Sequence, residues 1–402
     1  MCFWKWPGSR PRLSAVAPVG WDWRKAVDAQ QVLADVSAAI DRLSGQNGGA
    51  KVVVVIHSTG GLVLRRCLEL RPDLAERIEQ VLSFGIPWAG TLQSVIFLAV
   101  GQSFGLFPPF ELSADEVRGV MITSQAAYDL FPPDPNKTDM TDPDHTPLDL
   151  FMVQGQAFQA GPLVNLAWMP PGAPGDGMRK MATDADTRLG RRTSTIQIGE
   201  ATVPPITNLA GWGFPTLTRA TMAAGGTGGV GGGRALTFDT TTEGDGTIPL
   251  VSATWLRGPG VRTFVLPIGY YPEDQAPRMH SEIWDPPPVR QILDQVLKDS
   301  PAAPFICGAA DHDSAVDPES PIVVRLTAAD GNGQPLPQPQ FTTAGLPQPV
   351  TRPLPPGQVK AVLEIPRTNL RANAGSDLFR FEIRVGWQGA PAPVAVPILV
   401  HV

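Results

Sequence analysis

The chain has few cysteines, no excess of positive charge and no long apolar run. Its three cysteines, Cys2, Cys67 and Cys307, are too widely spaced for a zinc motif or a disulfide framework. Lysine and arginine number 32 against 38 acidic residues and are scattered along the chain, which argues against a nucleic-acid partner. The most apolar segment, residues 94–110, contains polar residues and two prolines, so no run of about 18 apolar residues is available to span a bilayer.

The first residues, Met1 to Pro7, lack the continuous apolar core of a secretory signal. From the residues as given we therefore expect a soluble, cytoplasmic protein. A translation start further upstream would allow a signal peptide to precede these residues, and secretion would then be expected instead.

The length and composition predict folded domains that are rich in loops. With 402 residues, 43% of them hydrophobic and 17% charged, the chain can form two domains of ordinary size, each with its own core. Proline (43) and glycine (41) make up roughly a fifth of the residues, against an average of about 12%. This excess argues against a purely helical bundle and predicts many loops or linkers.

The first hundred residues alternate between helical and strand patterns. Residues 25–43 carry apolar side chains at helical spacing and charged side chains on the other face, which predicts a surface helix. Residues 51–56 form a β-branched apolar run, typical of a strand buried on both faces of a parallel sheet. Residues 61–70 are expected to form a second helix and residues 80–86 a second buried strand. This order predicts an α/β fold with a doubly wound sheet.

Residues 91–233 lack such a pattern and are expected to form a long irregular insertion. The glycine run at its end, residues 225–233, is typical of a flexible hinge. It is not a phosphate-binding loop, because no Lys-Ser/Thr pair follows it. The regular pattern then resumes, with strands predicted at residues 235–240 and 261–268 and a helix at residues 289–297.

Residues 300–402 have a different character. Their apolar residues alternate or are β-branched in short segments separated by turn clusters, which predicts a small immunoglobulin-like antiparallel β-sandwich. This leaves residues 1–299 for the α/β domain and its insertion. The segments expected as strands are residues 321–328, 359–365, 378–385 and 394–402.

The most informative chemical feature is Ser58, which lies where a predicted strand turns into a predicted helix. A serine on such a strained turn presents its Oγ at the carboxyl edge of the sheet. The backbone N–H of Thr59 then lies at the positive end of the helix, where it can stabilise an oxyanion. Two glycines follow and allow the helix to approach, although Ile56 occupies the first glycine position of G-x-S-x-G. The alternative is that Ser58 only caps the helix.

A serine nucleophile needs a base, which on this fold follows the acid in chain order. His280 lies in a loop between the last predicted strand and the closing helix, where a base above the sheet edge is expected. The alternative is a solvated loop histidine. The other histidines lie beside the nucleophile, in an acidic loop, in the linker and in the β-domain; they are His57, His145, His312 and His401.

The candidate acid is Asp245, which lies between two glycines and follows a predicted strand. A carboxylate there can orient the imidazole and stabilise its charged form. The alternative is an ordinary turn aspartate, and Glu243 is the nearby substitute. The acidic stretch at residues 134–149 lacks the glycine and terminal glutamate of an EF-hand, so we expect no metal and no other cofactor.

Six motifs, in the right order, resemble those of the lecithin:cholesterol acyltransferase-like branch of the α/β-hydrolases. The resemblance covers roughly residues 14–298. It implies an α/β-hydrolase fold, lipid ester hydrolysis or acyl transfer, a Ser58–Asp245–His280 triad and a lid formed by the insertion. The motifs are Gly20-Trp21-Asp22-Trp23-Arg24, His57-Ser58-Thr59-Gly60-Gly61-Leu62, Gly85-Ile86-Pro87-Trp88-Ala89-Gly90-Thr91, Tyr128-Asp129-Leu130-Phe131-Pro132, Gly244-Asp245-Gly246-Thr247-Ile248-Pro249-Leu250 and His280.

The chain departs from that family at its front. In the family a strand and a loop with an oxyanion-hole donor precede the Trp-Asp-Trp-Arg motif, whereas only some twenty residues precede Trp21 here. We expect that the true start lies upstream, that another chain supplies this piece, or that the copy is degenerate. Loss of one oxyanion donor would cost about 10²- to 10³-fold in rate, and a sheet edge would be exposed.

These observations predict a serine esterase, lipase or O-acyltransferase that works through an acyl-enzyme. Trp88, Phe107 and Tyr128 are expected to contact the substrate, a lipid or related ester, with transient contact to a membrane surface; packing in the core is the alternative for such aromatic residues. The sequence leaves the oligomeric state open. The rival interpretation is a catalytically impaired hydrolase remnant that acts as a binding protein.

Overall fold

The structure, a computed structural model, describes most of the first hundred residues and shorter segments after them. The described residues are 15–99, 104–105, 111–132, 180–181, 184–185, 187, 189, 194–224, 234–241, 244–267, 280–285, 289–290, 293, 305–310, 321–329, 336–343, 350–351, 360–366, 378–390 and 392–401.

The chain divides into two compact units, each of which is described by itself. Residues 17–208 and 215–262 form the unit that carries Ser58 and Asp245, and we call it the nucleophile unit. Residues 1–16, 209–214 and 263–402 form the other, which we call the C-terminal unit. This division groups residues 263–299 with the C-terminal residues, whereas the sequence pattern assigned them to the α/β domain.

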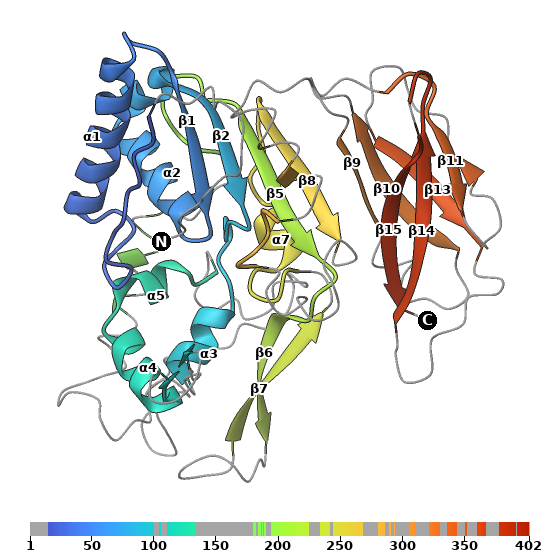
Figure 1. Cartoon of the computed structure of the whole chain (residues 1–402). Coiled ribbons are helices and arrows are strands. Elements are labelled where there is room, and N and C mark those ends of the chain that lie inside the picture. Colours follow the sequence, from blue (N-terminus) through green and yellow to red (C-terminus); the bar gives the residue numbers. More distant parts are fainter. Residues whose placement is uncertain are drawn as a thin grey trace. The chain divides into compact units, whose positions relative to one another are not determined.

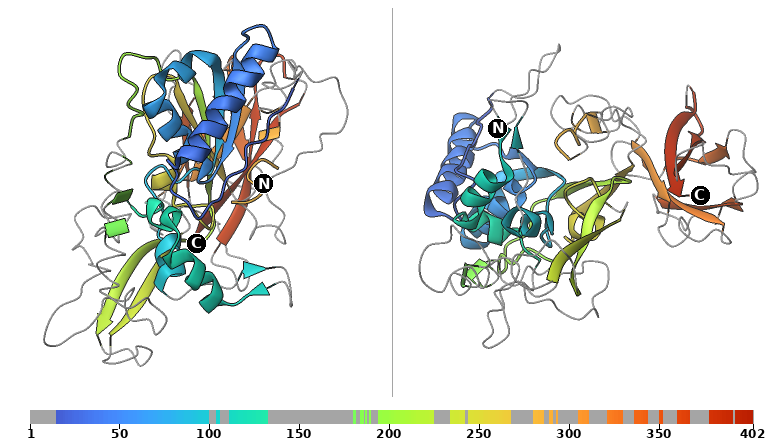
Figure 2. Two further views of the ribbon diagram at one scale, coloured as in Figure 1. Left: turned by 90° about the vertical axis from the view of Figure 1, so that its left-hand side faces the viewer. Right: turned by 90° about the horizontal axis from the view of Figure 1, so that it is seen from below.

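The nucleophile unit begins with a helix–strand–helix–strand order. Strands β1 and β2 pair in parallel, and Val54 lies opposite Val81. Both helices lie on the same side of these strands (Figure 1; Figure 2, left). This arrangement confirms the four elements predicted for the first hundred residues. Their bounds are α1 Gln30–Gln46, β1 Val52–His57, α2 Gly60–Leu70 and β2 Ile78–Phe84, with a 3-10 helix, η1, at Pro72–Arg77.

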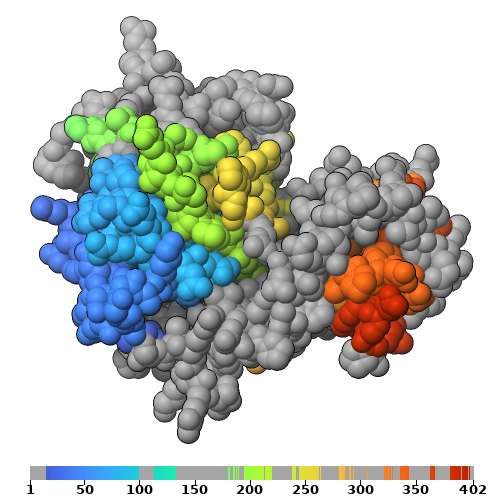
Figure 3. Space-filling view, turned by 90° about the horizontal axis from the view of Figure 1, so that it is seen from above, coloured from blue at the N-terminus to red at the C-terminus, as the bar shows by residue number. Residues whose placement is uncertain are grey.

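The core of this unit lies between the helices and the sheet. Helix α2 is buried almost all round, with Leu62 and Leu68 fully enclosed. Segment 194–205 closes part of the same core, because Val81 N–H donates to the carbonyl of Pro205 (2.8 Å) and the guanidinium of Arg65 donates to the carbonyl of Thr195 (3.2 Å). On the face drawn in Figure 3 this segment, in green, adjoins the blue and cyan elements.

The sheet has the strand order β1-β2-β5-β8, which corrects two expectations. Strand β5 (Ile206–Trp212) belongs to the sheet although it falls within the predicted insertion 91–233, so that insertion is not irregular throughout. Strand β1 is the last strand in the described order and is not buried on both faces: Val55 is 52% exposed. The predicted strand at 261–268 is confirmed as β8 (Val261–Pro267).

The apolar pattern of the sequence did not predict β5 because the strand contains polar residues in its middle. Asn208 is fully buried, and its side chain makes three hydrogen bonds. Its Oδ1 accepts from Ser83 Oγ (2.9 Å) and Trp88 Nε1 (3.2 Å), and its Nδ2 donates to the carbonyl of Ala253 (2.7 Å). A buried amide with all these partners is compatible with a central strand, yet it breaks the apolar run by which strands were recognised.

The rest of the nucleophile unit consists of short helices and a hairpin. The predicted strand at 235–240 is present as β7, and among the described strands it pairs with β6 alone, in antiparallel fashion. The predicted glycine hinge at 225–233 lies outside the described residues, as does most of the predicted helix at 289–297. The elements are α3 Gln93–Ala99, β3 Phe104–Gly105, β4 Glu111–Leu112, α4 Ala114–Ile122, α5 Gln125–Asp129, β6 Thr216–Ala224, β7 Arg234–Thr241 and α7 Leu250–Ala253.

The C-terminal unit contains two antiparallel sheets, with orders β12-β13-β10-β9 and β11-β14-β15. Alternate residues of β10 are fully buried, as in Ile322, Val324 and Leu326, so this strand presents one apolar face. In Figure 1, β14 and β15 lie in front of β10 and β13. The bounds are β9 Phe305–Ala310, β10 Ile322–Ala329, β11 Gln340–Thr343, β12 Val350–Thr351, β13 Lys360–Ile365, β14 Leu378–Gly386 and β15 Val394–His401.

No helix among the residues that the structure describes is both long and apolar enough to cross a bilayer.

Candidate active site

Ser58 occupies a strained turn at the carboxyl end of β1. Its φ is 51°, and among the described non-glycine residues it shares a positive φ only with Gln338. The left-handed region costs a residue with a side chain about 1–2 kcal/mol. Two backbone hydrogen bonds hold the turn: Ser58 N–H donates to the carbonyl of Phe84 (3.0 Å), and its own carbonyl accepts from Gly61 N–H (3.0 Å). Such strain persists only where the surroundings enforce it.

The start of α2 argues against a capping role for Ser58. The residue at the N-cap of α2 is Thr59, and no side chain caps the helix there. Within the described part of the chain, the backbone N–H of Thr59 donates to no acceptor. This N–H therefore lies at the positive end of a helix of 11 residues and is available for an anion.

The two glycines after Thr59 differ in what they allow. A Cβ on Gly61 would overlap the side chain of Ile86, whereas a Cβ on Gly60 would meet nothing within 4 Å. The close approach of α2 to the segment after β2 therefore depends on Gly61 alone. The expectation that both glycines serve this purpose is corrected for Gly60.

Asp245 lies in a buried, tightly hydrogen-bonded turn. Its side chain is 2% exposed, and its Oδ1 accepts from the backbone N–H groups of Thr247 (3.0 Å) and Ile248 (2.7 Å). Thr216 Oγ1 accepts from Gly246 N–H (2.8 Å) and lies where a Cβ on Gly244 would be. The turn therefore fixes one oxygen of the carboxylate. Glu243, the proposed substitute, lies outside the described residues.

The segment that follows β2 connects the two turns. We call residues 85–91 the spacer. Ser252 Oγ donates to the carbonyl of Gly90 (2.6 Å) and accepts from Ala89 N–H (3.1 Å), and Thr91 Oγ1 donates to the carbonyl of Thr247 (2.6 Å). Ser252 and Thr91 are not among the predicted site residues, although Thr91 ends one of the motifs and Ser252 lies two residues after another. The feature of the sequence that could have pointed to them is a small hydroxyl residue beside a glycine- or proline-rich turn.

His280, the predicted base, lies in a different unit from Ser58 and Asp245. It is half-buried in a turn at residues 280–285, which belong to the C-terminal unit. The structure therefore joins the turns of the predicted nucleophile and acid to one spacer, and the role of His280 stays a prediction.

Two of the three predicted substrate-contact residues lie buried in the core, which favours the alternative interpretation of core packing. Trp88 is buried in the main core and donates its Nε1–H to Asn208. Tyr128 is buried beside Phe131 and donates its hydroxyl to the carbonyl of Ile122 (2.8 Å); burial raises the pKa of its phenol. Both side chains are almost completely buried. Phe107 lies outside the described residues.

The remaining motifs stabilise the segment that leads into α1. Asp129 is fully buried, and its Oδ2 accepts from Val27 N–H (2.8 Å), which ties this segment to α5. Asp22 pairs with Arg24 through two side-chain hydrogen bonds (2.8 and 2.9 Å), and these bonds lower the pKa of Asp22 to about 2. Both contacts are structural in character.

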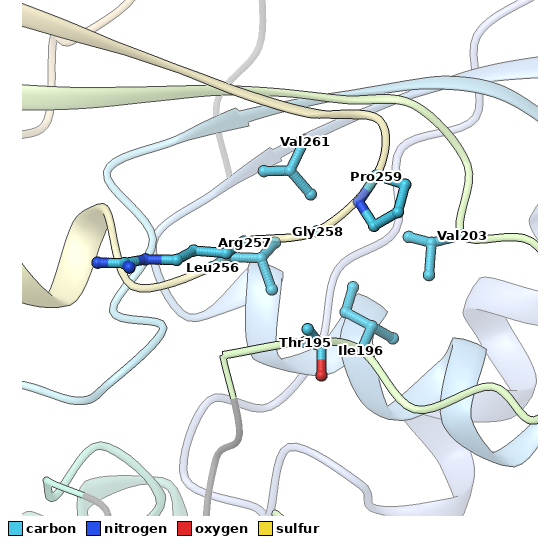
Figure 4. Close-up of a pocket in the computed structure, with 8 residues that line it drawn as sticks. All are labelled: Thr195, Ile196, Val203, Leu256, Arg257, Gly258, Pro259 and Val261. Carbon is cyan, nitrogen blue, oxygen red and sulfur yellow. The ribbon is translucent and has the colours of Figure 1, made fainter.

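A small cavity lies elsewhere in the nucleophile unit, between segments 195–203 and 256–261 (Figure 4). Its volume is about 100 Å³, and its lining includes Ile196, Val203, Leu256 and Val261. Ligand pockets usually measure about 300–1,000 Å³, and none of the predicted site residues lines this one. Among the described residues, no cluster of histidine, cysteine, aspartate and glutamate could hold a metal ion.

Comparison with known families supports the resemblance read from the motifs. The model of the lecithin:cholesterol acyltransferase family matches residues 11–184, which confirms that this segment resembles that family. The matched segment contains β1, the Ser58 turn, α2 and β2, and its features are consistent with an α/β-hydrolase fold. It ends before Asp245 and His280.

Among solved structures, the chain is similar to a chain in "The crystal structure of Tle4-Tli4 complex", with 17% identity and a TM-score of 0.41 over 61% of this chain and 60% of that one. The chain thus spans about 60% of the length of that protein. It is also similar to phospholipase PlaB from Legionella pneumophila, with 10% identity and a TM-score of 0.29 over 96% of this chain and 81% of that one. None of the curated proteins compared with the chain matches it.

Proposed function

We propose that this protein is a serine-dependent lipid ester hydrolase or O-acyltransferase. The observation that carries the proposal is Ser58 in a left-handed turn between a parallel strand and a helix, inside the segment that matches the lecithin:cholesterol acyltransferase family. That geometry suits a nucleophile, because the turn directs the hydroxyl away from the sheet and the helix N-terminus favours negative charge beside it.

The proposed reaction proceeds through an acyl-enzyme. His280 takes the proton of Ser58 Oγ as this oxygen attacks the ester carbonyl carbon, and the N–H of Thr59 stabilises the oxyanion that forms. The imidazolium then protonates the leaving alcohol. Water or an acceptor alcohol attacks the acyl-enzyme in the second half, with His280 again taking and returning the proton. Asp245 orients His280 and stabilises its charged form.

Three further parts of the proposal concern the surroundings of the site. The parts of residues 91–233 outside β5 act as a lid over a lipid substrate, and Phe107 contacts that substrate. Approach to such a substrate involves transient contact with a membrane surface. The two antiparallel sheets of the C-terminal unit support its interpretation as a β-sandwich.

One observation favours a second candidate, a catalytically impaired hydrolase that works as a binding protein. The strand that leads into the Ser58 turn lies at the end of the described sheet order, and Val55 on it is half exposed. A nucleophile on an open edge has fewer neighbours to fix it, and Thr59 is the one oxyanion donor that the sequence identifies. A missing second donor would lower the rate about 10²- to 10³-fold.

The experiment that separates the two candidates measures turnover of long-chain p-nitrophenyl esters and of phosphatidylcholine vesicles by the full chain. The proposal predicts product release by the wild type and none by Ser58→Ala. Addition of a long-chain alcohol then distinguishes the transferase, which forms a new ester, from the hydrolase, which releases fatty acid. Vesicle binding by both proteins without turnover by either would favour the binding protein.

A further inference from the structure

The spacer contacts both turns of the proposed site, and its contacts with the Ser58 turn are made by backbone and by packing. Phe84, the last residue before the spacer, accepts the N–H of Ser58, and Ile86 within it packs against Gly61. Both contacts leave little room for movement, since a single added carbon at Gly61 would overlap Ile86. The position of the Ser58 turn is therefore set by the start of the spacer.

The other end of the spacer is joined to the Asp245 turn by two buried hydroxyls. Ser252 is 0% exposed and makes both hydrogen bonds of its hydroxyl to the spacer, one as donor to Gly90 and one as acceptor from Ala89. Thr91 is 2% exposed and donates to the carbonyl of Thr247, two residues after Asp245. Both donor distances are 2.6 Å, at the short end for hydroxyl groups.

These contacts form one chain of covalent and hydrogen bonds from nucleophile to acid. It runs from the Ser58 turn through the spacer to the turn that holds Asp245. Catalytic groups must be held within fractions of an ångström, since a misplacement of about 1 Å can cost about 10²-fold in rate. Neither hydroxyl is needed to fill the core, because alanine at 252 and valine at 91 would occupy nearly the same space.

We infer that Ser252 and Thr91 are positioning residues, which fix the Asp245 turn at a set distance from Ser58 by way of the spacer. The inference rests on the proposed function. It assigns to these hydroxyls an effect on the rate of the chemical step, not on substrate affinity. It is separate from the roles of Ser58, Asp245 and His280.

The test compares Ser252→Ala and Thr91→Val with Thr91→Ser, which keeps the hydroxyl, and with Ser124→Ala as a control. Ser124 is also fully buried and donates a 2.6 Å hydrogen bond, but this bond goes to the carbonyl of Val120, outside both turns and the spacer. The measurements are kcat and KM for a p-nitrophenyl ester, the rate of fluorophosphonate labelling of Ser58, and amide hydrogen exchange in residues 85–91 and 244–249.

We expect Ser252→Ala and Thr91→Val to lower kcat about 10- to 100-fold with KM changed less than about 3-fold. Labelling slows and exchange in both segments speeds up, whereas Thr91→Ser restores the rate and Ser124→Ala leaves it unchanged. Should Ser252→Ala fail to fold, Thr91→Val still gives the comparison, because it removes the hydroxyl's hydrogen bonds to Thr247 and Gln93 with little change of shape.

Other results would separate the two claims. If the wild type turns over ester and kcat is unchanged in Ser252→Ala and Thr91→Val, the positioning role is overturned and the proposed function stays intact. An equal loss in Ser124→Ala would also overturn it, because general destabilisation would then explain the effect. A wild type that neither labels at Ser58 nor turns over ester would overturn the proposed function and the catalytic role of the hydroxyls together, while hydrogen exchange would still report whether they join the two segments.

Discussion

The Ser58 turn and the Asp245 turn are built in opposite ways. Ser58 is held in an unfavourable backbone conformation, in the turn directly after the strand at the end of the described sheet order. Asp245 is buried, and its turn is stabilised by hydrogen bonds to the backbone groups of its own residues and to Thr216. The comparison teaches that the nucleophile carries local strain, whereas the acid is placed by an excess of favourable contacts.

The largest expected effect concerns that strain. Ser58→Gly should lower ester turnover about 10⁶-fold, to background, and at the same time raise the free energy of unfolding by about 1 kcal/mol, because glycine adopts positive φ without cost. Ser58→Ala should lose the activity without the gain in stability. Turnover assays and urea denaturation check this; a glycine variant no more stable than the alanine variant would show that the turn is not strained.

The next effect concerns the Asp245 turn. Asp245→Asn should lower kcat about 10⁴-fold, as expected when a triad loses the charge that orients its base. The change in stability should be small, because the amide Oδ1 can still accept from Thr247 and Ile248. Asp245→Ala leaves those N–H groups without an acceptor and should cost about 1–3 kcal/mol besides. Activity in Asp245→Asn equal to that of the wild type would remove this residue from the site and leave an ordinary turn aspartate.

A pair of glycine variants tests how α2 supports the Ser58 turn. Gly61→Ala forces α2 and the spacer apart and should cost about 1–3 kcal/mol of stability. It should also slow fluorophosphonate labelling. Gly60→Ala is the matched control and should change neither, because its Cβ points into open space. Thermal denaturation and labelling rates measure both, and similar losses at the two positions would contradict the packing described here.

The smallest effect is chemical and reports on α2 in the native state. Cys67 is buried in this helix, and burial raises the pKa of its thiol to about 12. Only the thiolate reacts, so alkylation by iodoacetamide at pH 8 should be very slow in the folded protein and fast in urea. The buried neutral thiol also makes stability fall as pH rises from about 9 toward 12, because the unfolded chain loses this proton first. Cys67→Ala should flatten that decline, and rapid alkylation of the native wild type would contradict the burial.

The parts of the fold that the sequence predicted are those with a strong local pattern of apolar residues. The run from Val52 to Ile56 and the apolar face of α1 correspond to elements close to the predicted bounds. Strand β5 was missed because Asn208 breaks its apolar pattern, and the groups that bond to Asn208 come from segments at least 45 residues away in the sequence. Long-range hydrogen bonds of this kind leave no local signal.

The residues of the candidate site also differ in whether a local sequence pattern or only long-range contacts identify them. Ser58 could be predicted because strand, turn and helix patterns meet within a few residues. Trp88 and Tyr128 were assigned to the substrate from their motifs, but a motif does not reveal whether an aromatic ring points into the core or toward a ligand. The hydroxyls of Ser252 and Thr91 donate hydrogen bonds to carbonyls that lie 162 and 156 residues away along the chain. Their proposed role depends on these contacts, which form only in the folded protein.

The central claim, that Ser58 is the nucleophile of an ester-cleaving enzyme, is tested most directly by a fluorophosphonate probe. The folded full chain is incubated with the probe, digested and analysed by peptide mass spectrometry, with Ser58→Ala as the control. The account predicts a single phosphonyl adduct on the peptide that contains Ser58, absent from the variant and from urea-denatured protein. No adduct on the folded wild type, or an adduct on another residue that persists in Ser58→Ala, would contradict it.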